Sequence, residues 1–240
     1  MEELDTKKYA GIDLGKTSVQ FSIYREGQEE MSEESFPIAK EQQEAYIETG
    51  IHLVEEYMKE KEYQWSDYQA VHFSMQDPSE ENRDKLKESV SEEFLKFHTV
   101  KIITHFRAFA EYVFHQERIM WDRNTLLLDY HDNQLSYVLI DQIRRSRQKA
   151  YRAVEKQIDL NEYRVVEGTP EQDANFGQMV KRFLVKTPAN IIFLTGSGFE
   201  VNWMKKTLTY LCAGRRVFLG QNLYAIGWIP RRQAPFAYRF

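Results

Sequence analysis

The sequence predicts an α/β protein built from two similar halves that follow one another along the chain. Residues 10–24 (AGIDLGKTSVQFSIY) and residues 126–140 (LLLDYHDNQLSYVLI) share one pattern: an apolar strand that ends in an aspartate, a polar turn, and a second strand with alternating apolar residues. The same offset of 116 residues separates residues 100–112 from residues 216–228. A repeat of this length is too long for a solenoid unit and indicates two copies of one domain facing a central cleft, where ligands commonly bind.

The composition is that of a folded protein with a mixed surface. Of the 240 residues, 42% are hydrophobic and 29% are charged, and the formal net charge of −5 gives no global attraction to nucleic acid. The longest apolar runs fall far short of the roughly 18 residues of a membrane span. The N-terminal residues have no signal-peptide core. The single cysteine, Cys212, excludes an internal disulfide and fits a reducing compartment, so we expect a cytoplasmic protein.

The first half reads as three strands followed by alternating helices and strands. Apolar runs and alternation predict strands at 8–14, 18–25, 29–37, 69–75 and 100–104, with a hairpin turn at Glu26-Gly27. Helical spacing predicts helices at 40–62 and 105–116. Asp77 is expected to cap a helix that Pro78 opens and that continues to residue 97. The predicted order is βββαβαβα.

The second half repeats that order. Strands are expected at 124–130, 134–141, 147–159, 190–195 and 216–219, and helices at 171–186, 199–212 and 221–229. Residues 117–123 separate the two halves, so we expect domains at 1–118 and 119–240. The last ten residues, 231–240, are expected to form a surface tail.

The turn after the first strand has the chemistry of a phosphate-binding hairpin. Gly15 lets the backbone approach an oxyanion, and Lys16, Thr17 and Ser18 supply donors around it. Asp13, at the end of the strand, is placed to hold hydrated Mg²⁺, which prefers one or two carboxylates together with phosphate oxygens. A plain β-hairpin with glycine at its turn is the alternative.

Residues 11–24 (GIDLGKTSVQFSIY) resemble the first phosphate motif of the superfamily of actin, heat-shock chaperone and sugar kinase ATPases. Residues 126–140 stand where that superfamily has its second phosphate hairpin, and residues 191–203 (IIFLTGSGFEVNW) resemble its adenosine motif. Residues 105–112 and 221–228 take the place of the connecting helices, whose small residues permit close packing. The resemblance covers the whole chain and implies two ribonuclease H-like domains in tandem, each of order βββαβαβα.

The same resemblance implies ATP and Mg²⁺ as ligands of the cleft, with slow hydrolysis and conformational switching as an accompanying activity. Asp13 would organise the metal, Lys16 and Thr17 would hold phosphate oxygens, and Asp129 would orient the attacking water. The implied contacts to adenine and ribose are Thr195, Gly196, Ser197 and Gly198. A structural strand-end carboxylate for Asp129 and an ordinary helix-opening loop at residues 195–198 remain the alternatives.

The second turn departs from the superfamily pattern. Glycine and small hydroxylated residues are replaced there by Tyr130, His131, Asp132 and Asn133. A bulky side chain and an additional carboxylate would hinder ATP. In the first connecting helix, Arg107 and Phe109 replace smaller residues, and each half is too short for the insertions that complete the nucleotide site in larger members. A second hypothesis is therefore a non-catalytic interaction or assembly protein on a minimal, degenerate form of this fold.

A basic segment at residues 143–152 (IRRSRQKAYR) stands out in an acidic chain. Its cations are the candidate contacts to an anionic partner, expected to be an acidic protein rather than nucleic acid: Arg144, Arg145, Arg147, Lys149 and Arg152. A solvated hairpin tip is the alternative. The six histidines show no metal-ligand spacing, and the sequence contains neither a G-x-S-x-G nucleophile elbow nor a GxxxxGK[ST] loop.

Overall fold

The computed structural model describes residues 6–27, 32–116, 124–131, 134–145, 148–199, 202–220 and 222–227. These residues form two compact units, one containing the described residues up to 115 together with 222–227, and the other containing those from 116 to 220. The predicted junction at 117–123, the predicted tail at 231–240 and the turn residues Asp132 and Asn133 lie outside the described residues.

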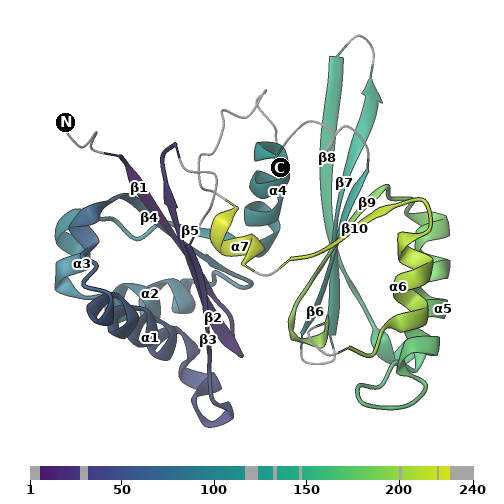
Figure 1. The fold of residues 1–240 in the computed structure, drawn as a ribbon, viewed down its shortest axis with the longest axis horizontal. Helices are drawn as coiled ribbons and strands as arrows, with labels where there is room; N and C mark the ends of the chain where they lie inside the picture. Colours follow the sequence, from purple (N-terminus) through teal and green to yellow (C-terminus); the bar gives the residue numbers. More distant parts are fainter. Residues whose placement is uncertain are drawn as a thin grey trace. The chain divides into compact units, whose positions relative to one another are not determined.

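The first unit is a five-stranded sheet with helices on both faces (Figure 1). The strands follow the order β3-β2-β1-β4-β5 and span β1 (Lys8–Leu14), β2 (Ser18–Arg25), β3 (Ser32–Pro37), β4 (Tyr68–Met75) and β5 (Ile102–Thr104). One face carries α1 (Tyr46–Glu60), α2 (Glu80–Ser89) and α3 (Glu92–Phe97), and the other carries α4 (His105–His115) and α7 (Leu223–Ile226). Two 3-10 turns, Lys40–Ala45 and Trp65–Asp67, precede α1 and β4.

The alternation of side chains along β1 decides which residues reach which face. Ala10, Ile12 and Leu14 are buried in the core cluster that they share with α1. Asp13 therefore projects from the opposite face, the one that carries α4 and α7. Tyr9 lies on that same face and packs beside Ile226 of α7. The position of Asp13 at the end of β1 thus follows directly from the apolar pattern of its neighbours.

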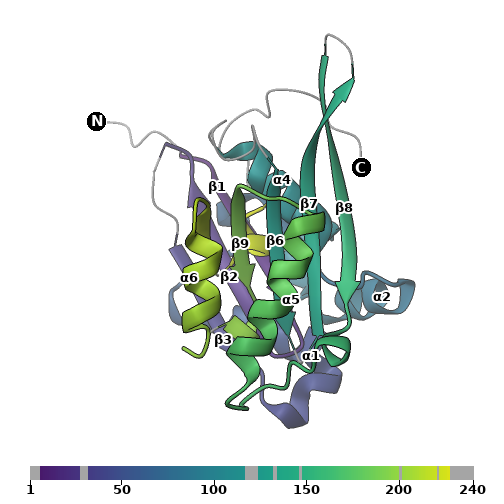
Figure 2. The ribbon, with the colours of Figure 1, turned by 90° about the vertical axis from the view of Figure 1, so that its right-hand side faces the viewer.

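The second unit contains another five-stranded sheet, in the order β10-β9-β6-β7-β8. Its strands are β6 (Thr125–His131), β7 (Gln134–Arg145), β8 (Gln148–Ile158), β9 (Ile191–Thr195) and β10 (Arg216–Leu219). Two 3-10 turns, Leu160–Tyr163 and Ser197–Phe199, and the helices α5 (Gln172–Lys186) and α6 (Lys205–Cys212) complete it. Figure 2 shows α5 and α6 side by side against one face of this sheet. In both units the first strand of the unit is central, antiparallel to the second and parallel to the fourth.

The predicted order βββαβαβα is confirmed in both halves, with differences in the helices. The segment predicted as one helix to residue 97 is two, because Val90 is extended and Ser91 accepts a hydrogen bond from the backbone of Phe94 to start α3. The predicted cap at Asp77 is also wrong: the side chain of Ser79 caps α2. In place of a helix from residue 199 to 212, a 3-10 turn at Ser197–Phe199 precedes α6, which begins at Lys205.

The helix α7 belongs to the first compact unit, which differs from the predicted division of the chain at residues 118 and 119. It packs against β1 and α4. The approach to α4 is close, because a Cβ atom on Gly227 would meet the backbone of Ala108. The small residues expected in the two connecting helices therefore serve the packing of one helix on the other.

Within the described residues, no helix combines the length and the apolar composition that a membrane crossing requires.

Candidate functional site

The β1–β2 turn brings the predicted phosphate-binding residues to one place, but part of its backbone is already bonded. The amide of Gly15 donates to the carbonyl oxygen of Ser18 at 3.0 Å, and a Cβ atom on Gly15 would lie 2.9 Å from that oxygen. The carbonyl oxygen of Thr17 accepts from Ile38 at 2.8 Å. Glycine is thus needed to close the turn on itself. Lys16 is exposed, and Thr17 and Ser18 are half-buried.

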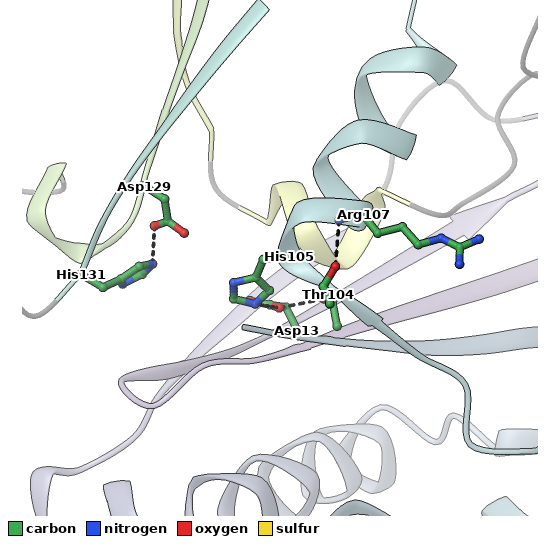
Figure 3. A network of polar contacts seen from close by, with 7 residues as sticks. Asp13, Thr104, His105, Arg107, Asp129 and His131 are labelled. Atoms are coloured by element: carbon green, nitrogen blue, oxygen red, sulfur yellow. Dashed lines mark hydrogen bonds and ion pairs between the residues drawn. The ribbon is translucent and has the colours of Figure 1, made fainter. Parts of the chain in front are cut away.

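Asp13 is held by two side chains from other parts of the first unit. Its Oδ1 atom lies 2.7 Å from Nε2 of His105 (Figure 3), and the hydroxyl of Ser74 donates to the same oxygen at 2.7 Å. Ser74 is the register partner of Asp13 on β4, and His105 opens α4 directly after β5. Because a carboxylate only accepts, the Nε2 atom of His105 donates, and both bonds are charge-assisted.

This contact lies in a buried environment. Asp13 is 5% exposed and His105 is 8% exposed. The imidazole of His105 stacks on the ring of Tyr224 in α7, with ring centroids 3.9 Å apart and planes 6° from parallel. The His105 ring is therefore fixed both by its hydrogen bond and by its stacking partner.

The Asp13 site does not fit a resident Mg²⁺ ion in this arrangement. A hydrated Mg²⁺ ion needs accessible oxygen ligands in near-ideal octahedral geometry. The Oδ1 atom of Asp13 already accepts two hydrogen bonds, and the side chain is almost fully buried. In the described part of the chain, no cluster of three or more His, Cys, Asp or Glu residues is arranged to hold a metal ion.

Asp129, at the equivalent position of the second unit, also has a histidine partner. Its Oδ1 atom lies 2.9 Å from Nε2 of His131, two residues further along β6, and Asp129 is 7% exposed (Figure 3). The Nδ1 atom of His131 accepts from the backbone amide of Ser197 at 3.4 Å, and the Ser197 hydroxyl lies 3.5 Å away. His131 thus links the strand-end carboxylate to the turn after β9. Thr195, the register partner of Asp129, is buried.

The glycines of the turn at residues 195–198 are explained by a neighbouring tyrosine. Gly196 has a φ of +104°, and a Cβ atom there would meet the backbone of Tyr130; a Cβ atom on Gly198 would meet the ring of Tyr130. Tyr130 is fully buried and packs with Phe176, Phe199 and Trp203. The indole nitrogen of Trp203 donates to the carbonyl oxygen of Gly198 at 2.7 Å. The turn is therefore shaped by packing within its own unit.

The basic segment lies on the β7–β8 hairpin. Arg144 pairs with Lys149 in the antiparallel register, and Arg145 pairs with Gln148. Arg147 lies outside the described residues. Arg152 forms a bidentate ion pair with its register partner Asp141, at 3.1 and 2.6 Å, so its charge has a partner within the hairpin.

Sequence reasoning did not identify His105, Ser74 and His131 as the partners of the two aspartates. The available signals were the position of His105 at the start of the helix after β5 and the position of His131 on the face of Asp129. A further buried titratable group was also not singled out: burial, together with the nearby charges of Lys101 and Arg107, lowers the pKa of His72 to about 3.

Comparison with known proteins gives a family and a fold. A family model described as "Family of unknown function (DUF5716) C-terminal" matches residues 22–229. A comparison with curated proteins found no significant match. A Bacteroides thetaiotaomicron protein with an actin-like ATPase fold and unknown function superposes with a TM-score of 0.51 at 10% identity, over 95% of this chain and 96% of that one.

Two enzymes are structurally similar at a lower level. The ROK hexokinase from Thermus thermophilus gives a TM-score of 0.47 at 14% identity, over 92% of this chain and 96% of that one. The PPX-GPPA enzyme of Aquifex aeolicus gives 0.47 at 18% identity, over 79% and 67%. At the level of the fold, the predicted resemblance is confirmed: the chain has two tandem ribonuclease H-like domains of the actin-like ATPase type.

Proposed function

The chain belongs to the family of unknown function (DUF5716) C-terminal, and we propose that it is a non-catalytic interaction or assembly module built on an actin-like fold. One observation carries the proposal. Asp13, the residue that would organise the metal in an active ATPase, is 5% exposed, and its Oδ1 atom accepts hydrogen bonds from His105 and Ser74. Displacing two charge-assisted hydrogen bonds to reach the metal costs free energy that an active site would have to recover.

The other predicted contacts support the same proposal. The amide of Gly15 is bonded to Ser18, and Asp129 is paired with His131. The glycines at positions 196 and 198 accommodate Tyr130. The amide of Gly15 and the carboxylates of Asp13 and Asp129 therefore have partners within their own units.

Calorimetry tests the proposal directly. ATP is titrated into the purified protein with and without Mg²⁺, and we expect no metal-dependent binding. The Asp13→Asn variant serves as the control for the site. Metal-dependent binding with micromolar affinity that disappears in Asp13→Asn would overturn the proposal.

Nucleotide binding, the function that the sequence predicts, is the second candidate, favoured by the exposed ammonium of Lys16 beside the half-buried hydroxyls of Thr17 and Ser18. In this function these three residues hold phosphate oxygens, and the turn at residues 195–198 contacts the nucleoside. Lys16→Ala would then weaken ATP binding. In titrations without Mg²⁺, His105→Phe would leave the ATP affinity unchanged. The same titrations measure both effects.

The interaction module is proposed to act in the cytoplasm, since the exposed thiol of Cys212 is unpaired and suits a reducing compartment. The β7–β8 hairpin, with Arg144, Arg145, Arg147 and Lys149, is proposed to meet an acidic protein. Charge reversal at Arg144 and Arg145 tests this contact. If the cations of the hairpin hold an acidic protein, the reversal would abolish binding of that protein.

A further inference from the structure

The outermost strand β10 has four residues and one charge, Arg216 at its first position, and its other three residues form an apolar edge. An exposed strand edge is a template for pairing with another chain, and proteins usually block it with charges, proline, short length or bulges. Three edges carry such features: β3 contains Glu33 and Pro37, β5 has three residues, and β8 carries charged residues such as Lys156. No charge, proline or bulge interrupts residues 217–219 of β10.

The side chains of β10 present apolar surface on both faces. Val217 packs beside the core cluster under α6. Phe218 points to the opposite face, where it stacks on Phe193 with centroids 5.2 Å apart, and it remains 37% exposed. Leu219 is 63% exposed. Two large apolar side chains are thus left partly in water at the edge of a sheet.

The backbone of β10 offers two amides to a further strand. The amides of Arg216 and Gly220 donate to Asn190 at 3.0 Å and to Leu194 at 2.9 Å, so they point toward β9. Because the backbone groups of successive residues in a strand point to opposite sides, Val217 and Leu219 direct theirs away from β9. In the described part of the chain, no strand pairs with β10 on that outer side.

The charges around the start of β10 are positive. Arg216 is exposed at the first position of the strand. The guanidinium of Arg215 and the ammonium of Lys181 both lie over the ring of Tyr210, at 5.3 and 5.2 Å from its centroid. An incoming segment with acidic residues at the end beside Arg216 and apolar residues beside Phe218 and Leu219 would complement this edge.

We propose that the outer edge of β10 binds an extended acidic-apolar segment of a partner protein by strand addition. This inference rests on the proposed role as an interaction module and names its surface and the chemistry of its partner. Main-chain hydrogen bonds to Val217 and Leu219 supply the pairing, and side chains beside Phe218 and Leu219 supply the selectivity.

The first experiment needs no partner. Hydrogen exchange of individual amides is followed by NMR on the full chain. We expect the amides of Val217 and Leu219 to exchange at least tenfold faster than those of Phe218 and Gly220, which face β9. Equal, strong protection of all four amides would show that the edge is already covered and would overturn the proposal. If that protection appears together with a dimer in light scattering, a second copy of the chain is the occupant instead.

The second experiment uses a fluorescein-labelled peptide, EVTVFVE, and measures its binding by fluorescence anisotropy. We expect the amides of Val217 and Leu219 to become protected on binding, and the charge-swapped peptide KVTVFVK to bind at least fivefold more weakly. Absence of binding at millimolar peptide would overturn the proposal.

A matched pair of variants distinguishes main-chain strand pairing from nonspecific hydrophobic binding of the peptide. Leu219→Pro removes an amide that points away from β9, so it costs no hydrogen bond within the sheet. Leu219→Thr removes the apolar side chain but keeps the amide. We expect Leu219→Pro to weaken peptide binding at least tenfold and Leu219→Thr less than threefold, with unchanged circular dichroism in both. Equal effects would contradict strand addition. ATP calorimetry reports on Asp13 and not on β10, so failure of one proposal is distinguishable from failure of the other.

Discussion

Replacing His105 by phenylalanine isolates the hydrogen bond that holds Asp13. The aromatic ring is kept, so the stacking on Tyr224 at 3.9 Å can persist, while the donor to Asp13 is removed. A hydrogen bond to a charged group contributes about 1.5–3 kcal/mol, and the cost is at the upper end when the acceptor stays buried. Asp13 is 5% exposed but retains the bond from Ser74, so we expect the free energy of unfolding to fall by about 2 kcal/mol.

Urea denaturation followed by circular dichroism measures this loss, and a double-mutant cycle assigns it. In the Asp13→Asn background, the same His105→Phe change is expected to cost about 1 kcal/mol less, because the charged acceptor is gone. A thermal scan should show a fall in Tm of about 4–8 °C. The reasoning would be refuted by a His105→Phe protein as stable as the wild type, or by equal losses in both backgrounds.

Three further predictions concern single residues. The pKa of His72 is lowered to about 3, so the folded protein excludes a proton that the unfolded chain binds below about pH 6.5. The free energy of unfolding therefore falls as the pH drops from about 6.5 to about 3. In urea titrations, His72→Gln should remove about 1–2 kcal/mol of the loss in unfolding free energy that the wild type shows between pH 7.5 and pH 5. Gly198→Ala should cost about 1–3 kcal/mol in the wild type, since its Cβ meets Tyr130, and far less in a Tyr130→Ala background; equal costs would argue against the collision. Burial opposes ionisation of Asp173, but hydrogen bonds from the start of α6 outweigh it and lower its pKa, so Asp173→Ala should cost about 1 kcal/mol at pH 7 and progressively less as the pH falls below 4, as measured by urea denaturation at each pH.

The fold was predictable because strand patterns are local. The apolar run that ends at Asp13 and the alternation of Val19, Phe21 and Ile23 are visible in the sequence, and the structure buries those three side chains. The break between α2 and α3 was missed although Ser91 followed by Glu92 and Glu93 is a recognisable helix start. The helical spacing of this segment predicts one continuous helix to residue 97 and hides the helix start at Ser91.

The candidate site was predictable only as positions, not as contacts. Asp13 meets Ser74 and His105 across 61 and 92 residues of sequence, and such distant pairing has no local pattern. The sequence points to Gly196 and Gly198 as contacts to adenine and ribose, and that role stays a prediction. The packing of Tyr130 against them, which requires glycine at both positions, depends on the parallel pairing of β6 with β9.

The position of α7 has a consequence for the order in which the protein folds during synthesis. Residues 222–227 complete the first unit, and they supply Tyr224 as the stacking partner of His105. They leave the ribosome after every described residue of the second unit. The N-terminal half of the chain is therefore completed last, because the face of its sheet that α4 covers still lacks α7, while the half translated later can already pack its own strands and helices.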